Sequence, residues 1–304
     1  MKNMTKILLL LPMMAAAVCA QAQTRKVAPA GQDYTIGSVM AASGSNVTYQ
    51  WFRNGVAIAG ATGASYTVPA LLAKHDNGLS ALYTSGIKFQ RAAYGIDCLG
   101  EAAMSNTVIV YFCELIVNGV CWARANADNV GRISSNPWDL GSFYQWNRPD
   151  VAYSATSPAV GVAVSGYPTP DYAATWTNGE PCPAGWRLPT QLDFENLHAV
   201  SQPAGGVWVT GGVRGVPVGT NGRFFGYNTD YCTISNMNGC VFLPAAGRRT
   251  NTGALAQDMG NYWANEQHTN SIGRSLYFSS TGVAQSSETS KSYALAIRCV
   301  IDVK

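Results

Sequence analysis

Cysteine and histidine have the widest chemistry of the side chains in this sequence, and their spacing narrows that range. The 304-residue chain holds eight cysteines, but no two of them have the C-x-x-C spacing. Its three histidines, His75, His198 and His268, are scattered along the chain. Zinc and iron–sulfur sites need several such ligands at short, regular intervals. The pattern therefore disfavours a metal centre and leaves disulfide formation as the expected chemistry of the thiols.

The first residues indicate export. Two lysines precede a 14-residue apolar run, residues 7–20, which leads into A-Q-A at 20–22. This run is shorter than a membrane span, and the alanines fit a signal-peptide cut after position 20 or 22. A membrane anchor is the alternative, and lipid attachment at Cys19 is disfavoured because Val18 precedes it. We predict that residues 1–22 are a signal peptide. The mature chain is expected in the periplasm, on the outer-membrane surface or outside the cell.

Seven cysteines remain after this cleavage, and an oxidising location makes disulfides the default. Spacing alone does not fix the pairing, so a Cys98–Cys113 bond remains the main alternative to the set that we predict. That set is Cys182–Cys299, Cys232–Cys240 and Cys113–Cys121, with Cys98 left as a free, buried thiol. The first bond would close a loop of over a hundred residues, worth roughly 4–5 kcal/mol in the chain-entropy model.

Composition excludes several classes of function. The formal charge is +3, only 12% of residues are charged and no basic run occurs, so nucleic acid is a poor partner. No G-x-S-x-G elbow is present, and the glycine-rich run 205–222 lacks the spacing of a phosphate-binding loop. That run is interpreted as strands with a loop near a binding face. His75 and Asp76 fit a solvated turn better than an acid–base pair. We predict no catalytic residue, no cofactor and no membrane span after cleavage.

The elements of the first part follow a β pattern. Residues 33–112 alternate apolar and polar side chains, and Asn54-Gly55 after 47–53 is a strong hairpin signal. Further strands are expected at 56–58, 65–68, 87–92 and 107–112, with Trp51 in the core. The segments YQWFRNG, SYTVPAL and SNTVIVYF resemble the immunoglobulin-like modules of bacterial surface proteins. This resemblance implies an all-β immunoglobulin-like sandwich over 25–112.

The second part has one convincing helix. Thr190 fits an N-cap with Asp193 at the capping-box position, so a helix is expected over 190–200. A second helix is expected near 128–131, and a closing strand at 293–300. Other strands are expected at 120–125, 141–146, 207–209, 241–246 and 276–278. This part also holds seven of the eight tryptophans, so long loops stapled by disulfides and buried indoles are expected.

Six segments in order resemble a known family. They are VNGVCWARANA, GSFYQWNR, CPAGWRLPTQLDFENL, VFLPAAGRR, GNYWANE and YALAIRCV. This run resembles the Fibrobacter succinogenes major paralogous domain, which is abundant in secreted and surface proteins of Bacteroidetes. The family is regarded as similar to the C-type lectin-like fold, which formylglycine-generating enzymes also use. The resemblance implies that 113–304 form an α+β C-type lectin-like domain with few helices and long disulfide-stapled loops. Its terminal strands should lie close together.

A sugar site is the functional question that this resemblance raises. Calcium-dependent lectins carry Glu-Pro-Asn or Gln-Pro-Asp and a later Trp-Asn-Asp, which this sequence does not match. A metal-free site remains a candidate, because aromatic faces stack on sugars while amides and charges bond hydroxyls. Its candidate residues are Trp263, Tyr262, Asn265, Glu266 and Arg248. The alternatives are that Tyr262 and Trp263 belong to the core and that Arg248 and Arg249 lie in a solvated or salt-bridged turn.

Three hypotheses for the function follow. The first is an exported, surface-associated binding or adhesion protein in which the stalk presents a lectin-like head to a glycan or protein. The second is a structural subunit of an extracellular assembly, such as a pilus tip or surface layer, whose partners are envelope subunits. The third is an enzyme on a formylglycine-generating scaffold, which would need free cysteines for copper. The first hypothesis is favoured because no catalytic constellation is visible.

Overall fold

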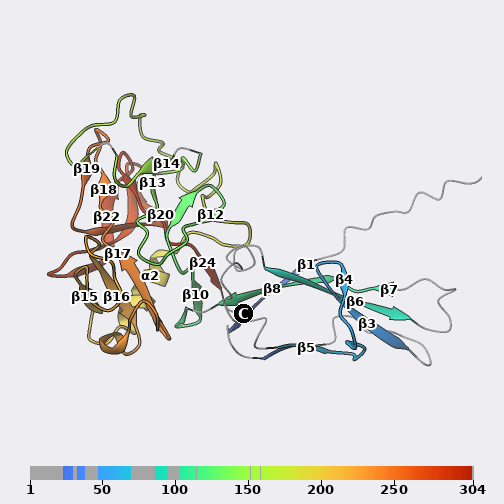
Figure 1. The fold of residues 1–304 in the computed structure, drawn as a ribbon. Helices are drawn as coiled ribbons and strands as arrows, with labels where there is room; N and C mark the ends of the chain where they lie inside the picture. The colour runs from blue at the N-terminus through green and yellow to red at the C-terminus, as the bar shows by residue number, and fades with distance from the viewer. Residues whose placement is uncertain are drawn as a thin grey trace, which may run out of the picture.

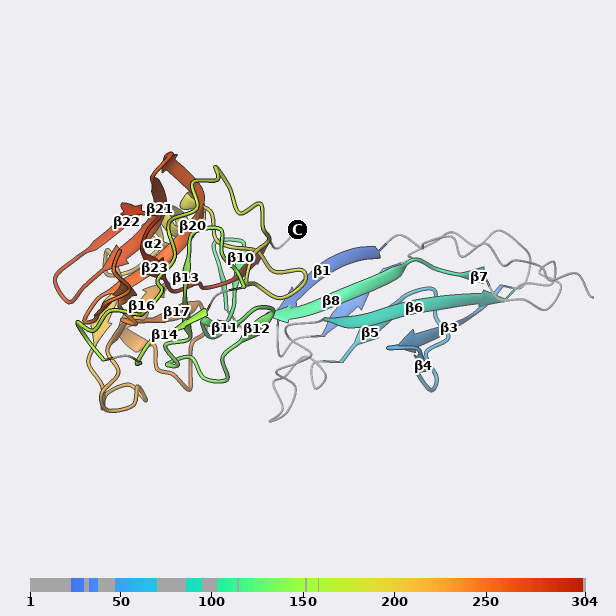
Figure 2. The same cartoon turned by 90° about the horizontal axis from the view of Figure 1, so that it is seen from above.

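The computed structural model describes residues 23–29, 33–37, 47–69, 86–94, 103–113, 115–150, 152–157 and 159–302. The predicted signal peptide, Cys98 and the turn at 75–76 lie outside these residues. The N-terminal strands form an elongated unit that extends from a broader head built by the rest of the chain (Figure 1, Figure 2). Within the described part of the chain, the helical segment is too short to cross a membrane.

The N-terminal unit consists of two sheets. The larger sheet has the order β1 (Gln23–Pro29), β8 (Thr107–Cys113), β6 (Ile87–Tyr94), β3 (Thr48–Arg53) and β4 (Val56–Ala57). A short strand, β7 (Ala103–Met104), pairs with β6, and β1 runs parallel to β8. The second sheet pairs β2 (Tyr34–Ile36) with β5 (Tyr66–Val68). In its described residues the unit is therefore two-layered and all-β, as the alternating sequence predicts.

The core of this unit lies between the two sheets. Trp51 and Phe89 from the larger sheet are fully buried against Ile36 and Val68 from the smaller one. The hairpin between β3 and β4 turns at Asn54 and Gly55, whose φ angles are 49° and 84°. Two left-handed residues in succession are what the Asn-Gly pair tolerates best, so this local prediction is confirmed.

The head is a set of short sheets around one helix. Its terminal strands form one sheet, β24 (Val300–Asp302), β10 (Val120–Trp122) and β9 (Ile116–Val117), so the two ends of the head pair as expected. A five-stranded sheet has the order β14 (Ala152–Ser154), β13 (Ser142–Gln145), β23 (Ala294–Leu295), β18 (Arg248–Arg249) and β19 (Leu255–Ala256).

Two further three-stranded sheets complete the head. One contains β15 (Val207–Val209), β16 (Gly222–Gly226) and β17 (Cys240–Pro244), with the 3-10 helix η1 (Thr229–Tyr231) between the last two strands. The other contains β20 (Gly260–Thr269), β21 (Ile272–Phe278) and β22 (Val283–Ser290). Aromatic residues from both sheets, including Phe224, Phe242 and Phe278, meet in the main core of the head.

Helix α2 (Gln191–Ala199) forms as its sequence predicts. Thr190 accepts a hydrogen bond from the backbone N–H of Asp193, and the Asp193 carboxylate accepts one from the backbone N–H of Thr190. This reciprocal capping box satisfies two amide groups that a helix start leaves free. Phe194 and Leu197 share one face and are buried in the core, with Phe194 packed against Trp122.

All three predicted disulfides are present: Cys113–Cys121, Cys182–Cys299 and Cys232–Cys240. The bond between Cys182 and Cys299 joins residues 117 positions apart, with a Cα–Cα distance of 5.8 Å. It staples the lead-in to α2 onto the segment that precedes β24, as the sequence suggested.

Two predicted elements are wrong. The stretch 293–300 is not one strand, because β23 and β24 belong to different sheets and the carbonyls of Ile297 and Cys299 between them accept from Ala127 and Ala123. The segment 128–131 is not a helix either. It is the hairpin β11 (Ala127–Asn129) to β12 (Arg132–Ile133), which turns at Gly131 with φ 74°.

A small apolar cluster joins the two parts of the molecule. Tyr111 at the end of β8 is buried against the partly buried Trp186, and the Cys113–Cys121 bond lies in the same cluster. A Cβ added to Gly185 would lie 2.3 Å from the Tyr111 hydroxyl oxygen. The chain at this joint is therefore packed without room for another methyl group.

Candidate functional site

The two aromatic residues predicted to stack on a sugar are core residues. Trp263 is 0% exposed, donates from Nε1 to the carbonyl of Tyr144 (2.8 Å) and lies edge-on to Trp146 with ring centroids 5.3 Å apart. Tyr262 is also 0% exposed, and its hydroxyl donates to the Pro244 carbonyl (2.7 Å). Burial raises the pKa of Tyr262 to about 12. Neither ring offers a face to a ligand, so the structure corrects the stacking prediction in favour of the core alternative.

The next two predicted residues hold the start of the helix. The backbone N–H of Asn265 donates to the Pro189 carbonyl (2.9 Å), and a Glu266 carboxylate oxygen accepts from the backbone N–H of Gln191 (2.8 Å). Burial raises the pKa of Glu266, and Asp193 contributes in the same direction, while this hydrogen bond and Arg187 oppose it. Both residues are half-buried and fix β20 to the lead-in of α2.

Arg248 lies apart from the other four, on a different sheet. It is half-buried, and its guanidinium lies 4.9 Å from the centre of the Tyr293 ring. Its neighbour Arg249 is fully buried and donates to the carbonyls of Ser154 and Ser157, both at 2.6 Å. The five predicted contact residues lie on two sheets and two of them are fully buried, so they do not form one exposed site. Arg249 holds the chain at the end of β14 and just after it.

Four exposed apolar side chains of the head lie elsewhere, on two loops next to β16. They are Val213 and Val218 in the loop 210–221, and Tyr227 and Tyr231 in the loop 227–239. Val218 is 88% exposed and Tyr231 is 83% exposed. We call these four side chains and the two loops that carry them the tyrosine loop face.

The backbone of the tyrosine loop face is fixed by a buried side chain, by hydrogen bonds and by a disulfide. Between the two exposed valines, Val216 is buried in the core. Arg214 joins the loops, because its guanidinium donates to the Thr229 carbonyl (2.6 Å) and its own carbonyl accepts from Ile234 N–H (2.9 Å). The Cys232–Cys240 bond closes the base of the second loop. Exposed side chains on a fixed backbone lose little entropy on binding, which favours recognition.

The chemistry of this face is nearly neutral. Arg214 and Asp230 are its only charged residues within 210–221 and 227–239, whereas the exposed polar groups are mostly amides and hydroxyls. Tyrosine, asparagine, serine and glycine are also the residues that dominate antibody contact loops. The sequence signal was the glycine run 205–222, and the tyrosines of the second loop were missed because their exposure depends on tertiary packing.

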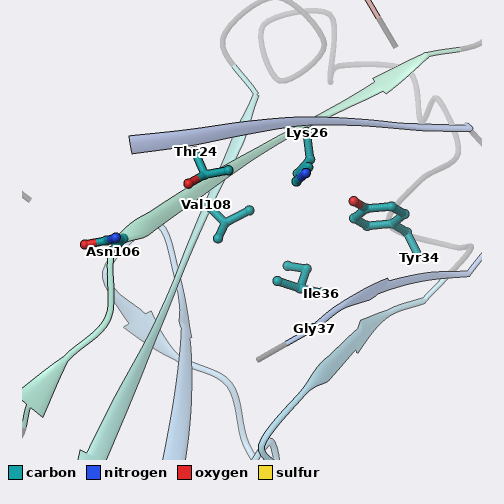
Figure 3. A pocket seen from close by; sticks show the side chains of 7 residues that line it. All are labelled: Thr24, Lys26, Tyr34, Ile36, Gly37, Asn106 and Val108. Carbon is teal, nitrogen blue, oxygen red and sulfur yellow. The ribbon is translucent and has the colours of Figure 1, made fainter. Parts of the chain in front are cut away.

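An open groove of about 340 Å³ lies in the N-terminal unit (Figure 3). Ile36 and Val108 provide apolar lining, and Thr24, Lys26, Tyr34, Gly37 and Asn106 complete the wall. Its residues come from β1 and β2, the segment just after β2, and β8 with the residue before it. Burial raises the pKa of Tyr34 above its ordinary value. Among the described residues that line the groove, Lys26 is the only charged one.

Metal-binding side chains do not gather in the described residues. No three His, Cys, Asp or Glu side chains there lie close enough together to hold a metal ion. The six cysteines that the structure describes are all in disulfides.

Comparison with known families agrees with the sequence motifs. The model of the Fibrobacter succinogenes major domain matches residues 98–301. The chain belongs to this family. This match begins at residue 98, whereas the sequence predicted the start of the domain at residue 113. The matched region therefore includes β7 and β8 of the N-terminal unit. No curated protein matches the chain.

Proposed function

We propose that this member of the Fibrobacter succinogenes major domain family is an exported, surface-associated binding protein, and that the tyrosine loop face is where it contacts a partner. One observation carries the proposal: Tyr231 and Val218 are almost fully exposed on loops fixed by a disulfide and by Arg214. Large apolar side chains gathered on rigid surface loops are typical of interaction sites.

A protein is the partner class that this face favours. It carries exposed apolar side chains, a single arginine and a single aspartate, and several asparagines with a serine, which suits a protein surface more than a charged polymer. In this proposal the N-terminal unit is an immunoglobulin-like stalk, and the head is a C-type lectin-like domain that binds without calcium. The disulfides and the N-terminal sequence support export to an oxidising location.

The structural-subunit alternative would use the same face for an envelope subunit. The enzyme alternative has less support, because the cysteines that a copper-dependent oxidase needs are in disulfides throughout the described residues. We therefore propose a binding protein without catalytic activity.

Surface plasmon resonance against purified extracellular proteins tests this proposal. Collagen, fibronectin and laminin are the first probes, together with outer-membrane proteins purified from the same cell. We expect at least one to bind the wild-type protein, and the double variant Tyr231→Ala, Val218→Ser to bind about tenfold more weakly.

Val130→Ser is the matched control, because Val130 is 55% exposed on the β11–β12 hairpin, away from the tyrosine loop face. It should bind like the wild type. Equal binding by the wild type and the double variant, or no binding to any probe, would overturn the proposed face.

A further inference from the structure

Outside the tyrosine loop face, an exposed aromatic side chain lies on the loop 168–178, which several hydrogen bonds and a buried tryptophan hold in place. Within residues 168–178, Trp176 points into the core, where its ring centroid is 5.6 Å from that of Trp146. Tyr172 on the same loop is 57% exposed. The inward indole anchors the loop, and the outward ring is presented to solvent.

Both neighbours of Tyr172 are held by hydrogen bonds. The carbonyl of Ala173 accepts from Trp146 Nε1 (2.9 Å) and from Lys291 Nζ (2.7 Å). On the other side, Asp171 accepts from the amide of the buried Asn147 (2.9 Å) and from the backbone N–H of Ala173 (2.8 Å). Tyr172 is therefore fixed in place before any ligand arrives.

Holding the loop in this way has an energetic cost. Lys291 is fully buried, and its ammonium group donates to two neutral acceptors, the Ala173 carbonyl and Gln267 Oε1 (3.0 Å). It also lies 4.8 Å from the Trp146 ring. Burial lowers the pKa of Lys291, with Asp171 opposing that shift. An apolar side chain would fill this space at less cost, and locally expensive choices of this kind concentrate at functional sites.

The groups around Tyr172 suit a ligand rich in hydroxyls. Asn178 is exposed, and its Nδ2 lies 3.4 Å from an Asp171 carboxylate oxygen. The hydroxyl of Thr177 accepts from Asn147 Nδ2 (3.1 Å) and is on an exposed residue. A carboxylate, an amide and a hydroxyl beside an aromatic ring can bond sugar hydroxyls while the ring covers the apolar face of the sugar.

We propose that Tyr172, with Asp171, Thr177 and Asn178, forms a second contact site that binds a neutral carbohydrate. This site is separate from the tyrosine loop face. In Figure 1 the yellow-green chain that follows β14 lies at the opposite end of the head from β15 and β16. Lys291 is a positioning residue, because it acts through the Ala173 carbonyl.

An array of neutral oligosaccharides with gluco-, manno-, xylo- and galacto-configured chains tests this site on the full-length mature protein. We expect binding to at least one sugar series, followed by titration calorimetry with the strongest one. Tyr172→Ala should weaken that affinity about tenfold, whereas Tyr172→Phe should keep most of it because the ring face remains. Lys291→Met should also weaken binding while the urea midpoint stays equal or rises, which a merely structural lysine would not produce.

Tyr231→Ala is the control, because it removes a similarly exposed ring from the tyrosine loop face. It should bind the sugar normally, so the two proposals can fail separately. No binding to any neutral sugar, or equal binding by wild type and Tyr172→Ala, would overturn the carbohydrate site.

Discussion

At the residue scale, Arg298 ties three separate stretches of the head together. Its guanidinium, fully buried, donates to Asn126 Oδ1 (2.9 Å) and to the carbonyls of Ala123 (2.9 Å), Arg124 (2.7 Å) and Phe242 (3.0 Å). Burial lowers its pKa to about 10, so the side chain is still charged at neutral pH. The bonds to Asn126, Ala123 and Phe242 are buried, so these acceptors would have no water to replace the guanidinium, whereas the bond to Arg124 is partly buried.

Replacing Arg298 by methionine should therefore be costly. Met fills the volume but leaves several buried carbonyls without a donor, each worth about 1–3 kcal/mol, so we expect a loss of about 3 kcal/mol or more. Urea denaturation measures it. The control is Arg132→Met, which removes an arginine with a largely exposed side chain paired to Asp128 and should leave stability close to that of the wild type. Equal losses in the two variants would contradict the role of Arg298.

Glu266 predicts a pH dependence with a definite sign. Burial raises its pKa above the ordinary value of 4.5, so the folded protein holds this proton more tightly than the unfolded chain. Its contribution to the free energy of unfolding is therefore greatest below pH 4.5 and is lost as the pH rises through the folded-state pKa. Asp193, Arg187 and the Gln191 N–H are the groups that face this carboxylate.

The variant Glu266→Gln keeps an oxygen for the Gln191 N–H and removes the titration. We expect its melting temperature to equal or exceed that of the wild type at pH 7, and to fall less between pH 4.5 and 7. Thermal unfolding across that range measures both effects. Asp230→Asn, which removes an exposed acid on η1, is the control for a change of charge elsewhere on the head. A Glu266→Gln protein that is less stable at pH 7 would show that the charge itself is needed.

At the element scale, predictions from sequence held where the controlling contacts are local. The turn at Asn54-Gly55 and the cap of α2 depend on neighbouring residues, and both form as predicted. The stretch 293–300 was predicted as one strand because its apolar pattern is continuous. Its backbone instead changes partners after β23, and those partners are distant in sequence.

Dependence on distant contacts also explains why the sequence did not predict which aromatic residues are exposed. Trp263 and Tyr231 are both aromatic residues near glycine and asparagine, and composition does not separate a buried ring from an exposed one. Burial of Trp263 is decided by Trp146 and Tyr144, more than a hundred residues earlier. Spacing alone did not fix the disulfide pairing, and a Cys98–Cys113 bond was the main alternative to the predicted set; the structure has the three predicted bonds.

At the joint between the two parts, close packing depends on a glycine. Gly185 has φ 93°, and a Cβ there would meet the Tyr111 hydroxyl at 2.3 Å. Gly179 has a similar φ of 92° but nothing within 4 Å of the same added atom. The two glycines therefore share the backbone strain of an alanine substitution and differ only in the clash.

We expect Gly179→Ala to cost about 1 kcal/mol and Gly185→Ala to cost more, because Tyr111 must also move. Small-angle scattering should show a wider spread of shapes for Gly185→Ala alone. In a Tyr111→Ala background, Gly185→Ala should cost less than it does in the wild type, because the clashing ring is gone. If Gly185→Ala behaves like Gly179→Ala in both measurements, the joint is looser than its packing indicates.

At the scale of the whole molecule, the family boundary and the structural boundary do not coincide. The family match begins at residue 98 and therefore includes β8, which lies between β1 and β6 in the N-terminal sheet. The same strand ends at Cys113, whose disulfide partner Cys121 is in β10 of the head (Figure 2). One strand thus serves both parts, which favours a molecule that presents its head in a fixed direction.

The two kinds of staple should differ in what they contribute. Removing the Cys182–Cys299 bond, which spans 117 positions, should cost about 5 kcal/mol in the chain-entropy model, against about 2.5 kcal/mol for Cys113–Cys121, which spans 8. Paired Cys→Ala variants, compared by urea denaturation without reductant, measure each loss. If removing Cys113–Cys121 costs more stability than removing Cys182–Cys299, the length of the closed loop does not set the contribution of this bond. Its effect would then come from the native packing of Tyr111 and Trp186 at the joint, because that cluster contains the bond itself.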